Sequence, residues 1–266
     1  MAIVRRACHT RRVGHAGTLD PFATGLLLVL VGRATRLARY LVGLPKDYQG
    51  VFHLGITTST DDATGEITGT SDAWRTLDDD RLGVAMASLL GEREQVPPAY
   101  SAKRIGGERA HRLARRGAPV TLAPTRVQVH RFELVDHAGP RVRFAATVGS
   151  GTYLRSLARE LGEALGCGAH LVELRRTAIG PFPVDGAMSL EDVRQGRAVL
   201  APPAAALAHL PAASVDRAAV DRLTRGQPID ASHSPDGPVA LLCDGALVAV
   251  ARAREGKWHP ETVLAG

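Results

Sequence analysis

Asp20 is the only carboxylate in a run of small and turn-forming residues that extends from Gly14 to Gly25. The run contains three glycines, one proline and two threonines. Glycine permits positive φ and close backbone approach, and a residue before proline disfavours helix. These residue types predict a loop of defined shape, whose carboxylate can act as a nucleophile or as an electrostatic stabiliser. The alternative is that Asp20 only initiates the turn before Pro21.

An apolar run, residues 26–31, follows this loop directly and is bounded by Gly25 and Gly32. The run predicts a buried strand, although its periodicity also fits a segment of buried helix. A rigid buried strand is a suitable support for a reactive side chain on the neighbouring loop.

Arg155, in residues 149–157, is a second candidate for chemistry. Thr152 is predicted to cap a helix whose buried stripe contains Leu154, Leu157, Ala158, Leu161 and Leu165. Arg155 then lies in the first turn, off that stripe. Because cations are favoured at helix C-termini, an arginine at the opposite end indicates a specific partner. The alternative is an isolated surface arginine.

Tyr48 lies in residues 46–55, which predict a strand, and Asp62 lies in the polar turn of residues 58–65. Taken alone, Tyr48 fits a half-buried core residue and Asp62 fits a solvated Asx turn. The cluster of Asp61, Asp62 and Glu66 has too few converging ligands to predict a magnesium site. No histidine or cysteine spacing predicts a metal site, and no phosphate-binding or dinucleotide-binding motif is present.

Residues 97–117 are rich in arginine, lysine and glycine and include Lys103 and Arg104. Such a segment fits either a flexible RNA clamp that becomes ordered on binding or a solvated helix face. A helix over residues 77–90 precedes it. Strands over residues 126–135 and 141–148 follow it and are predicted to form a hairpin.

These segments together resemble the TruB family of tRNA pseudouridine synthases. The family pattern G-H-x-G-x-L-D-P-x-A-x-G is matched at Gly14, His15, Gly17, Leu19, Asp20, Pro21, Ala23 and Gly25. Further matches are K-x-Y at residues 46–48, T-x-T-x-D-x-x-G at 58–65, G-T-Y-[IL]-R-[ST]-L at 151–157 and G-x-x-A-x-x-x-x-L-R-R-T at 166–177. Residues 98–110 resemble P-x-Y-S-A-x-K-x-x-G-x-R-A, with Arg104 at the usual lysine position.

The resemblance implies that Asp20 is the catalytic residue and that Arg155 pairs with it. A guanidinium beside a carboxylate favours its charged form, so the pairing is expected to keep Asp20 ionised. The resemblance also implies that Tyr48 stacks on the target base and takes a proton from it. Asp62 is expected to pair with an active-site arginine or to orient another group of the site.

Other residues are implied to line the pocket or to contact the RNA, namely His15, Asp62, Lys103, Arg104, Tyr153, Leu174 and either Arg175 or Arg176. The target base has to leave its stack before it can react. His15 is expected to fill the space that the base leaves, and Leu174 to pack against the bound base. The arginines and Lys103 are expected to contact backbone phosphates.

The implied fold is α+β, a pseudouridine synthase fold with a central, mostly antiparallel mixed sheet flanked by helices. This domain is expected to cover residues 1–208. Residues 209–266 are expected to form a small PUA-like C-terminal domain, with a helix near 216–225 and strands near 239–242 and 247–252, that helps hold the tRNA acceptor end. Residues 1–13 are expected to be a lead-in without the family's N-terminal strand and Lys-Pro-x-Gly segment, which would expose a sheet edge.

The composition indicates which kind of partner the protein binds and in which cellular compartment it works. The chain has 266 residues, of which 45% are hydrophobic, enough for one or two domains. A net charge of +6 favours a polyanionic partner, which the resemblance implies to be the T arm and acceptor end of tRNA. Three widely spaced cysteines, the absence of a signal segment and the short apolar runs predict a cytoplasmic protein without membrane association. No metal and no cofactor are expected, and the protein is expected to be a monomer.

The resemblance implies an isomerase that converts the T-loop uridine at tRNA position 55 to pseudouridine, with assistance to tRNA folding as an accessory effect. Two other function classes stay open. One is a non-catalytic RNA-binding protein on the same scaffold. The other is a metal-dependent RNA nuclease, for which the acidic residues do not cluster convincingly.

Overall fold

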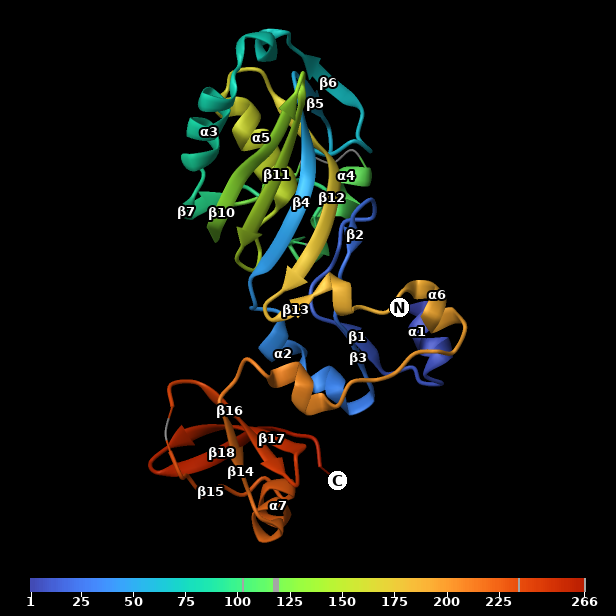
Figure 1. Ribbon diagram of the computed structural model, residues 1–266, viewed down its shortest axis with the longest axis vertical. Helices are drawn as coiled ribbons and strands as arrows, with labels where there is room; N and C mark the ends of the chain where they lie inside the picture. Colours follow the sequence, from blue (N-terminus) through green and yellow to red (C-terminus); the bar gives the residue numbers. More distant parts are fainter. Residues whose placement is uncertain (102, 117–119, 234, 266) are drawn as a thin grey trace.

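The computed structural model describes residues 1–101, 103–116, 120–233 and 235–265. A large sheet with its helices lies at one end of the long axis, and a small C-terminal sheet lies at the other (Figure 1). Short helical segments from the N-terminal part and from the segment before the small sheet lie between them (Figure 1). None of the helices in the described residues is long and apolar enough to cross a membrane.

The main sheet, over the described residues, has seven strands in the order β13-β12-β4-β11-β10-β7, with β2 also paired to β12. All pairs are antiparallel except β2 with β12, which makes the sheet mixed but mostly antiparallel, as predicted. The strands are β2 (Thr24–Gly25), β4 (Lys46–Leu54), β7 (Gly91–Gln95), β10 (Thr125–Ala138), β11 (Arg141–Val148), β12 (Ala169–Ile179) and β13 (Phe182–Pro183). The strand and hairpin predictions for residues 46–55, 126–135 and 141–148 are therefore confirmed.

Helices α3 (Asp79–Ala87) and α5 (Leu154–Ala164) pack on this sheet and form its main core with it (Figure 1). Phe52 of β4 stacks on Phe144 of β11 with ring centroids 4.0 Å apart. Burial of apolar side chains between sheet and helices, most of them aliphatic here, is the main source of stability for such a layered fold. This core fixes α5, and therefore Arg155, relative to the centre of the sheet.

The start of α5 differs from the prediction. Tyr153 is the N-cap residue, and no side chain caps the helix there. Thr152 Oγ1 donates to the carbonyl oxygen of Gln128 at 3.4 Å instead. The cap prediction for Thr152 is wrong because the threonine lies one position too early and bonds to β10.

The run from Gly14 to Gly25 is not wholly a loop, contrary to prediction. Strand β1 (Val13–His15) pairs with β3 (Val29–Val31), and β2 ends the run against β12. Only the last three residues of the predicted strand 26–31 form a strand. The reason is that Leu26 N–H donates to the Arg176 carbonyl at 2.9 Å, so the chain has to leave β12 before it can pair with β1. Asp20 thus lies on a loop that is anchored in sheets at both ends.

Gly25 is required where β2 meets β12, because its φ is +95° and an added Cβ would lie 2.2 Å from the Arg176 carbonyl oxygen. We expect Gly25→Ala to lower the free energy of unfolding by about 3 kcal/mol, through positive-φ strain and backbone collision. Gly32→Ala is the control, since its φ is +62° but nothing lies within 4 Å of the added Cβ. It should cost about 1 kcal/mol. Equal losses for the two variants in urea unfolding would show that the approach of β2 to β12 is not tight.

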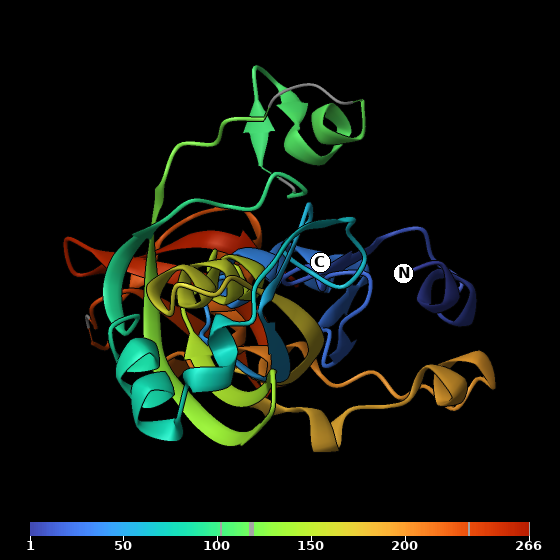
Figure 2. The same cartoon turned by 90° about the horizontal axis from the view of Figure 1, so that it is seen from above.

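Two segments extend from the main sheet. One is the hairpin of β5 (Ile56–Thr58) and β6 (Ile67–Thr70), followed by η2 (Ala73–Thr76). The other contains β8 (Arg104–Ile105), β9 (Glu108–Arg109) and α4 (Ala110–Arg115), and it projects away from the rest of the chain (Figure 2). The projection of the second segment is consistent with the predicted clamp.

The N-terminal residues include a helix that the sequence did not predict, α1 (Ala2–Ala7), which contacts α6 (Leu190–Arg194). Helix α6 begins with a capping box formed by Ser189 and Asp192. Ser189 Oγ accepts from Asp192 N–H at 3.1 Å, and the Asp192 carboxylate accepts from Ser189 N–H at 3.3 Å. The turn η3 (Val184–Gly186) joins α6 to the main sheet.

The predicted small C-terminal unit is present as a five-stranded sheet of order β14-β16-β17-β18-β15, counted over the described residues. It has its own core, which includes Trp258, Leu223 and Val239. The elements are β14 (Ala212–Ser214), α7 (Arg217–Thr224), β15 (Ile229–Asp230), β16 (Pro238–Cys243), β17 (Ala246–Arg254) and β18 (Lys257–Val263).

The two sheets are joined through η1 (Gly32–Leu37), α2 (Ala38–Leu41) and η4 (Pro203–Leu207). Arg33 and Arg36 donate to carbonyl oxygens of Leu264 and Val263 at 3.2 and 2.8 Å. Tyr40 and Thr262 share a hydrogen bond of 3.0 Å between their hydroxyls. The segment that directly follows the Asp20 loop and β3 is therefore fastened to the C-terminal strand.

Candidate active site

Asp20 and Arg155 meet in the structure although 135 positions separate them in the chain. Arg155 Nε donates to Asp20 Oδ2 at 3.0 Å and Nη2 donates to Oδ1 at 2.8 Å, a bidentate ion pair. The Arg155 side chain is 5% exposed and that of Asp20 is 26% exposed. The carboxylate is therefore open to a substrate, whereas its counter-ion is not.

Arg155 is also held from its other side. Nη1 lies 3.5 Å from Asp62 Oδ2 and donates to the Thr60 carbonyl at 3.3 Å. Nη2 donates to the Tyr100 carbonyl at 3.1 Å. These contacts explain how an arginine that lies off the apolar stripe is buried, and the alternative of an isolated surface arginine is wrong.

Asp62 is fixed by its own turn so that one oxygen faces Arg155. Its Oδ1 accepts from Thr60 Oγ1 at 2.7 Å, from Thr64 N–H at 2.9 Å and from Thr64 Oγ1 at 2.5 Å. The Asp62 side chain is 6% exposed. The predicted pairing with an active-site arginine is present. The Asx turn is present too, but it is buried and not solvated as the alternative had it.

The neighbouring pair of Asp61 and Arg159 holds the same turn one helical turn further along α5. Arg159 Nη1 lies 2.5 Å from Asp61 Oδ2, and Nη2 donates to the Val96 carbonyl at 2.8 Å. Burial raises the pKa of Asp61, and the charge of Arg159 opposes that rise. Both aspartates are engaged by arginines, and the described residues contain no group of three or more histidine, cysteine, aspartate or glutamate side chains that could hold a metal ion.

Tyr48, on β4, is 8% exposed and its ring belongs to the main core. Arg176 Nη1 donates to the Tyr48 hydroxyl at 3.4 Å. Burial raises the pKa of Tyr48, the charge and hydrogen bond of Arg176 oppose the rise, and the charge of Asp20 adds to it. The Tyr48 hydroxyl is therefore close enough to sense Asp20 and is protonated at neutral pH.

Tyr153 is the N-cap residue of α5, and its backbone is held by two hydrogen bonds to Gln95. Its N–H donates to Gln95 Oε1 at 2.8 Å, and Gln95 Nε2 donates to its carbonyl at 3.3 Å. Burial raises the pKa of Tyr153, and the charges of Arg155 and Asp20 also act on its hydroxyl. Tyr153 therefore lies beside the ion pair. Gln95, which is 1% exposed, was missed because a single glutamine in a short strand carries no signal of its own.

The other predicted site residues differ in their surroundings. Leu174 is 6% exposed and belongs to the main core on β12. His15 is exposed on β1, and Arg175 is exposed on β12 next to Leu174. Lys103 is partly buried at the base of the projecting segment, where its carbonyl accepts from Ala110 N–H at 2.7 Å. Arg104 is placed in β8 by its backbone, and its side chain lies outside the described residues.

Arg176 is a residue of the site to which the sequence gave no distinct role. It is 1% exposed, in contrast to Arg175 beside it. The period of two along a strand could have separated the pair, because Arg176 shares a face with the buried Leu174 while Arg175 shares one with the exposed Glu173. Because Arg176 is buried and Arg175 is exposed, only Arg175 of the two can contact a phosphate.

Lys46 is a second residue near the site that the sequence did not single out. It is 7% exposed at the start of β4 and donates from Nζ to the carbonyls of Val42 and Leu44 at 3.0 and 2.7 Å. Burial, and to a smaller degree the charge of Arg176, lower the pKa of Lys46 from 10.5 to about 8. Two buried cations, Lys46 and Arg176, are therefore close enough to interact, and Arg176 is also bonded to the Tyr48 hydroxyl.

Lys46 makes the stability depend on pH. Below pH 8 it is charged in the folded and the unfolded chain, and between about pH 8 and 10.5 only the folded chain releases its proton. The unfolded state then binds more protons, so stability rises with pH over this window, by up to about 3 kcal/mol. Lys46→Met should remove this rise. Urea unfolding between about pH 7 and 10 measures it, and parallel pH curves for the native and variant proteins would contradict the lowered pKa.

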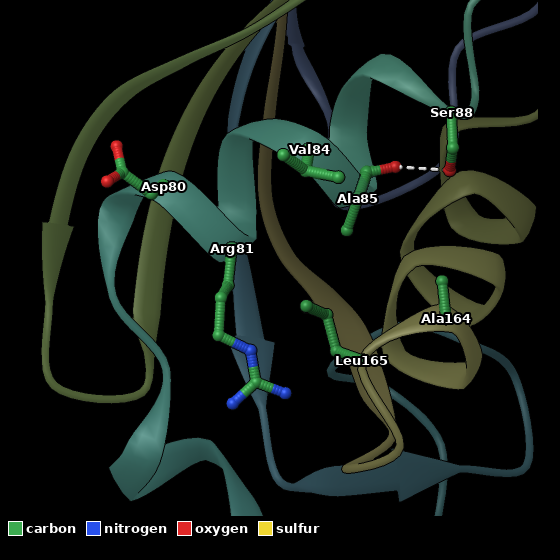
Figure 3. Close-up of a pocket in the computed structure, with 7 residues that line it drawn as sticks. All are labelled: Asp80, Arg81, Val84, Ala85, Ser88, Ala164 and Leu165. Atoms are coloured by element: carbon green, nitrogen blue, oxygen red, sulfur yellow. Dashed lines mark hydrogen bonds between the residues drawn. The ribbon is translucent and has the colours of Figure 1, made fainter.

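A groove of about 440 Å³ lies between α3 and the C-terminal end of α5 (Figure 3). Its lining residues are Asp80, Arg81, Val84, Ala85, Ser88, Ala164 and Leu165. None of the predicted site residues lines it. The chemistry-bearing groups instead gather where the Asp20 loop, the turn of residues 58–65 and the start of α5 meet.

The chain is similar to proteins of known family. The family model "TruB family pseudouridylate synthase (N terminal domain)" matches residues 5–154, and the model "tRNA pseudouridylate synthase B C-terminal domain" matches residues 155–206. A protein named tRNA pseudouridine synthase B from Thermobifida fusca is 42% identical, over 100% of this chain and 93% of that protein. A protein of the same name from Cupriavidus metallidurans is 41% identical, over 99% of this chain and 89% of that protein.

Solved structures show the same fold. A chain of "Structure of H/ACA RNP bound to a substrate RNA containing 2'-deoxyuridine" matches with a TM-score of 0.73 and 24% identity, over 100% of this chain and 80% of that chain. A chain of "Crystal structure of the archaeal box H/ACA sRNP Nop10-Cbf5 complex" matches with a TM-score of 0.71 and 24% identity, over 98% and 80%. The predicted pseudouridine synthase fold is confirmed. On the family match and the relatives' identity, the chain belongs to the TruB family of pseudouridylate synthases.

Proposed function

We propose that the protein is a tRNA pseudouridine synthase that converts the T-loop uridine at position 55, with Asp20 as its catalytic residue. The observation that carries this proposal is the solvent-facing Asp20 carboxylate held in bidentate contact by a buried Arg155. The relatives from Thermobifida fusca and Cupriavidus metallidurans, both named tRNA pseudouridine synthase B, support tRNA as the substrate. Residues 1–208 form the catalytic domain and residues 209–266 the second domain in this proposal.

The reaction is an isomerisation of the nucleotide. The uracil is detached at its C1′–N1 bond, turned, and rejoined to C1′ through C5. An ionised carboxylate that faces the substrate can act as the nucleophile or stabilise positive charge on the detached sugar. Arg155 orients that carboxylate, and Asp62 together with the Thr60 and Tyr100 carbonyls prevents Arg155 from turning away.

The last step removes the proton from C5 of the rejoined base. Tyr48 takes this proton, and the electron pair of the C5–H bond restores the C5–C6 double bond. Because burial raises the pKa of Tyr48, its hydroxyl is protonated in the resting protein, and it has to release that proton to solvent before the oxygen can accept the one from C5. The reaction rate is therefore sensitive to the charges that surround the Tyr48 oxygen.

The RNA has to present an unstacked base, which costs a few kcal/mol. The exposed side chain of His15 on β1 is placed next to the Asp20 loop to fill the vacated space. Leu174 and Tyr153 border the bound base. The projecting segment with Lys103 and Arg104, the exposed Arg175 and the net charge of +6 supply contacts to phosphates. The smaller sheet holds the acceptor end.

Tritium release tests this proposal. An unmodified tRNA transcript that carries 5-tritiated uridine loses tritium to water only when C5 is deprotonated. We expect multiple turnovers on the whole transcript and on its isolated T-arm hairpin, and none on a hairpin in which cytidine replaces the target uridine. RNA binding without tritium release would favour the non-catalytic alternative.

A further inference from the structure

Arg176 is the most enclosed cation beside the site, with 1% of its surface exposed. Among the described residues it forms no ion pair with a carboxylate, unlike Arg155 and Arg159, and its hydrogen-bond partners are all uncharged. A buried guanidinium without a counter-ion is costly. A charged side chain at this buried position therefore indicates a role for Arg176 that a neutral side chain could not fill.

The guanidinium holds the backbone on both sides of Asp20. Before Asp20, Nη2 donates to the Gly17 carbonyl at 3.2 Å and Nη1 donates to the Thr18 carbonyl at 3.3 Å. After Asp20, Nε donates to the Leu26 carbonyl at 2.8 Å. The guanidinium therefore joins the two ends of the loop that carries the Asp20 carboxylate.

The same group also contacts Tyr48. Nη1 donates to the Tyr48 hydroxyl at 3.4 Å, and the guanidinium carbon lies 6.0 Å from the centre of the tyrosine ring. Because the tyrosine oxygen accepts a hydrogen bond from Arg176, its own proton points elsewhere. The positive charge of Arg176 favours the ionised form of Tyr48 and opposes the effect of burial.

We propose that Arg176 is a positioning residue of the reaction, which fixes the Asp20 loop from both sides and supplies the positive charge that the Tyr48 oxygen needs when it takes the C5 proton. This inference rests on the proposed function, and it adds to that function a residue that touches neither the target base nor the RNA backbone. The C5 proton goes to the Tyr48 phenolate, which becomes a neutral phenol, and the charge of Arg176 is unchanged throughout.

Two variants separate the two parts of the role. Arg176→Lys keeps a cation but lacks the planar fork that reaches three carbonyls at once. Arg176→Gln keeps hydrogen-bonding capacity but lacks the charge. Single-turnover tritium release should fall about 10²-fold for Arg176→Lys, since loop misplacement alone has an effect of this size. It should fall about 10³-fold for Arg176→Gln, and RNA affinity should change by less than about threefold in both.

The state of Tyr48 provides a readout independent of activity. Tyrosine labelled with ¹³C at Cζ gives one signal for each of the four tyrosines, and Tyr48→Phe identifies the one that belongs to Tyr48. We expect this signal to titrate at higher pH in Arg176→Gln than in the native protein, and to move less in Arg176→Lys. The pH at which the single-turnover rate stops rising should shift in the same order.

Several outcomes would overturn the inference. They are native rates in either variant, identical Tyr48 titrations in the two variants and the native protein, or a loss of RNA affinity that accounts for the loss of rate. If neither variant folds, Tyr48→Phe decides, because it removes only the oxygen that Arg176 contacts; a native rate would overturn the charge role. Absence of tritium release by the native protein would instead refute the proposed function, while the Tyr48 titration would still report on Arg176.

Discussion

Asp20→Asn is expected to reduce pseudouridine formation by at least about 10⁴-fold, which is the scale seen when a nucleophile is removed from an enzyme. Asparagine has the same shape as aspartate, but it has no negative charge and is a poor nucleophile. Arg155 would still find the side-chain oxygen, so the loop between β1 and β2 should keep its conformation. The measurement is single-turnover tritium release at saturating transcript.

Two controls make this result interpretable. RNA affinity of Asp20→Asn should stay within a few-fold of the native value, because the neutral amide adds no repulsion toward phosphates. The free energy of unfolding should fall by about 1–2 kcal/mol, since one partner of the pair with Arg155 loses its charge. Activity within about tenfold of native in Asp20→Asn would exclude Asp20 as the catalytic residue.

Arg155→Met should have the second-largest effect, on stability and activity together. The change leaves Asp20 and Asp62 without their shared cation, and the side chain of Asp62 is 6% exposed. Removing one partner of a buried ion pair costs about 3–5 kcal/mol. Activity should fall by at least about 10³-fold, because the Asp20 carboxylate loses both hydrogen bonds that orient it.

Arg159→Met is the matched control, one turn further along α5. Its side chain is 26% exposed and pairs with Asp61 rather than with Asp20. We expect it to lower the free energy of unfolding by about 1 kcal/mol, and to lower the rate far less than Arg155→Met does. Denaturant unfolding and tritium release on the same preparations compare the two arginines. Equal effects of both variants would mean that Arg155 only holds the turn of residues 58–65 in place.

The convergence of Asp20 with Arg155 could be predicted from the motifs, and so could the pairing of Asp62 with an active-site arginine. Long strands such as β4 and β11 were also predictable, because eight or nine residues of alternating burial give a clear pattern. By contrast, β1 and β2 contain three and two residues, too few for any period to appear. Their pairing is decided by distant partners, β3 and β12.

The roles of Arg176, Lys46 and Gln95 could not be predicted from residue type. Arginine and lysine are normally exposed, and only the tertiary structure shows which ones are buried. Arg176 depends on three carbonyls of a loop that is about 150 residues away in the chain. Lys46 depends on the carbonyls of Val42 and Leu44, which follow α2. Burial of such groups follows from the packing of loops, which has no periodic signal in the sequence.

The most direct test of the account is to map pseudouridine at single-nucleotide resolution in an unmodified tRNA transcript after incubation with the native protein and with Asp20→Asn. The account predicts one pseudouridine with the native protein, in the T loop at position 55, and none with the variant. Modification at other positions, modification that persists in Asp20→Asn, or no modification by a native protein that binds the transcript would contradict it.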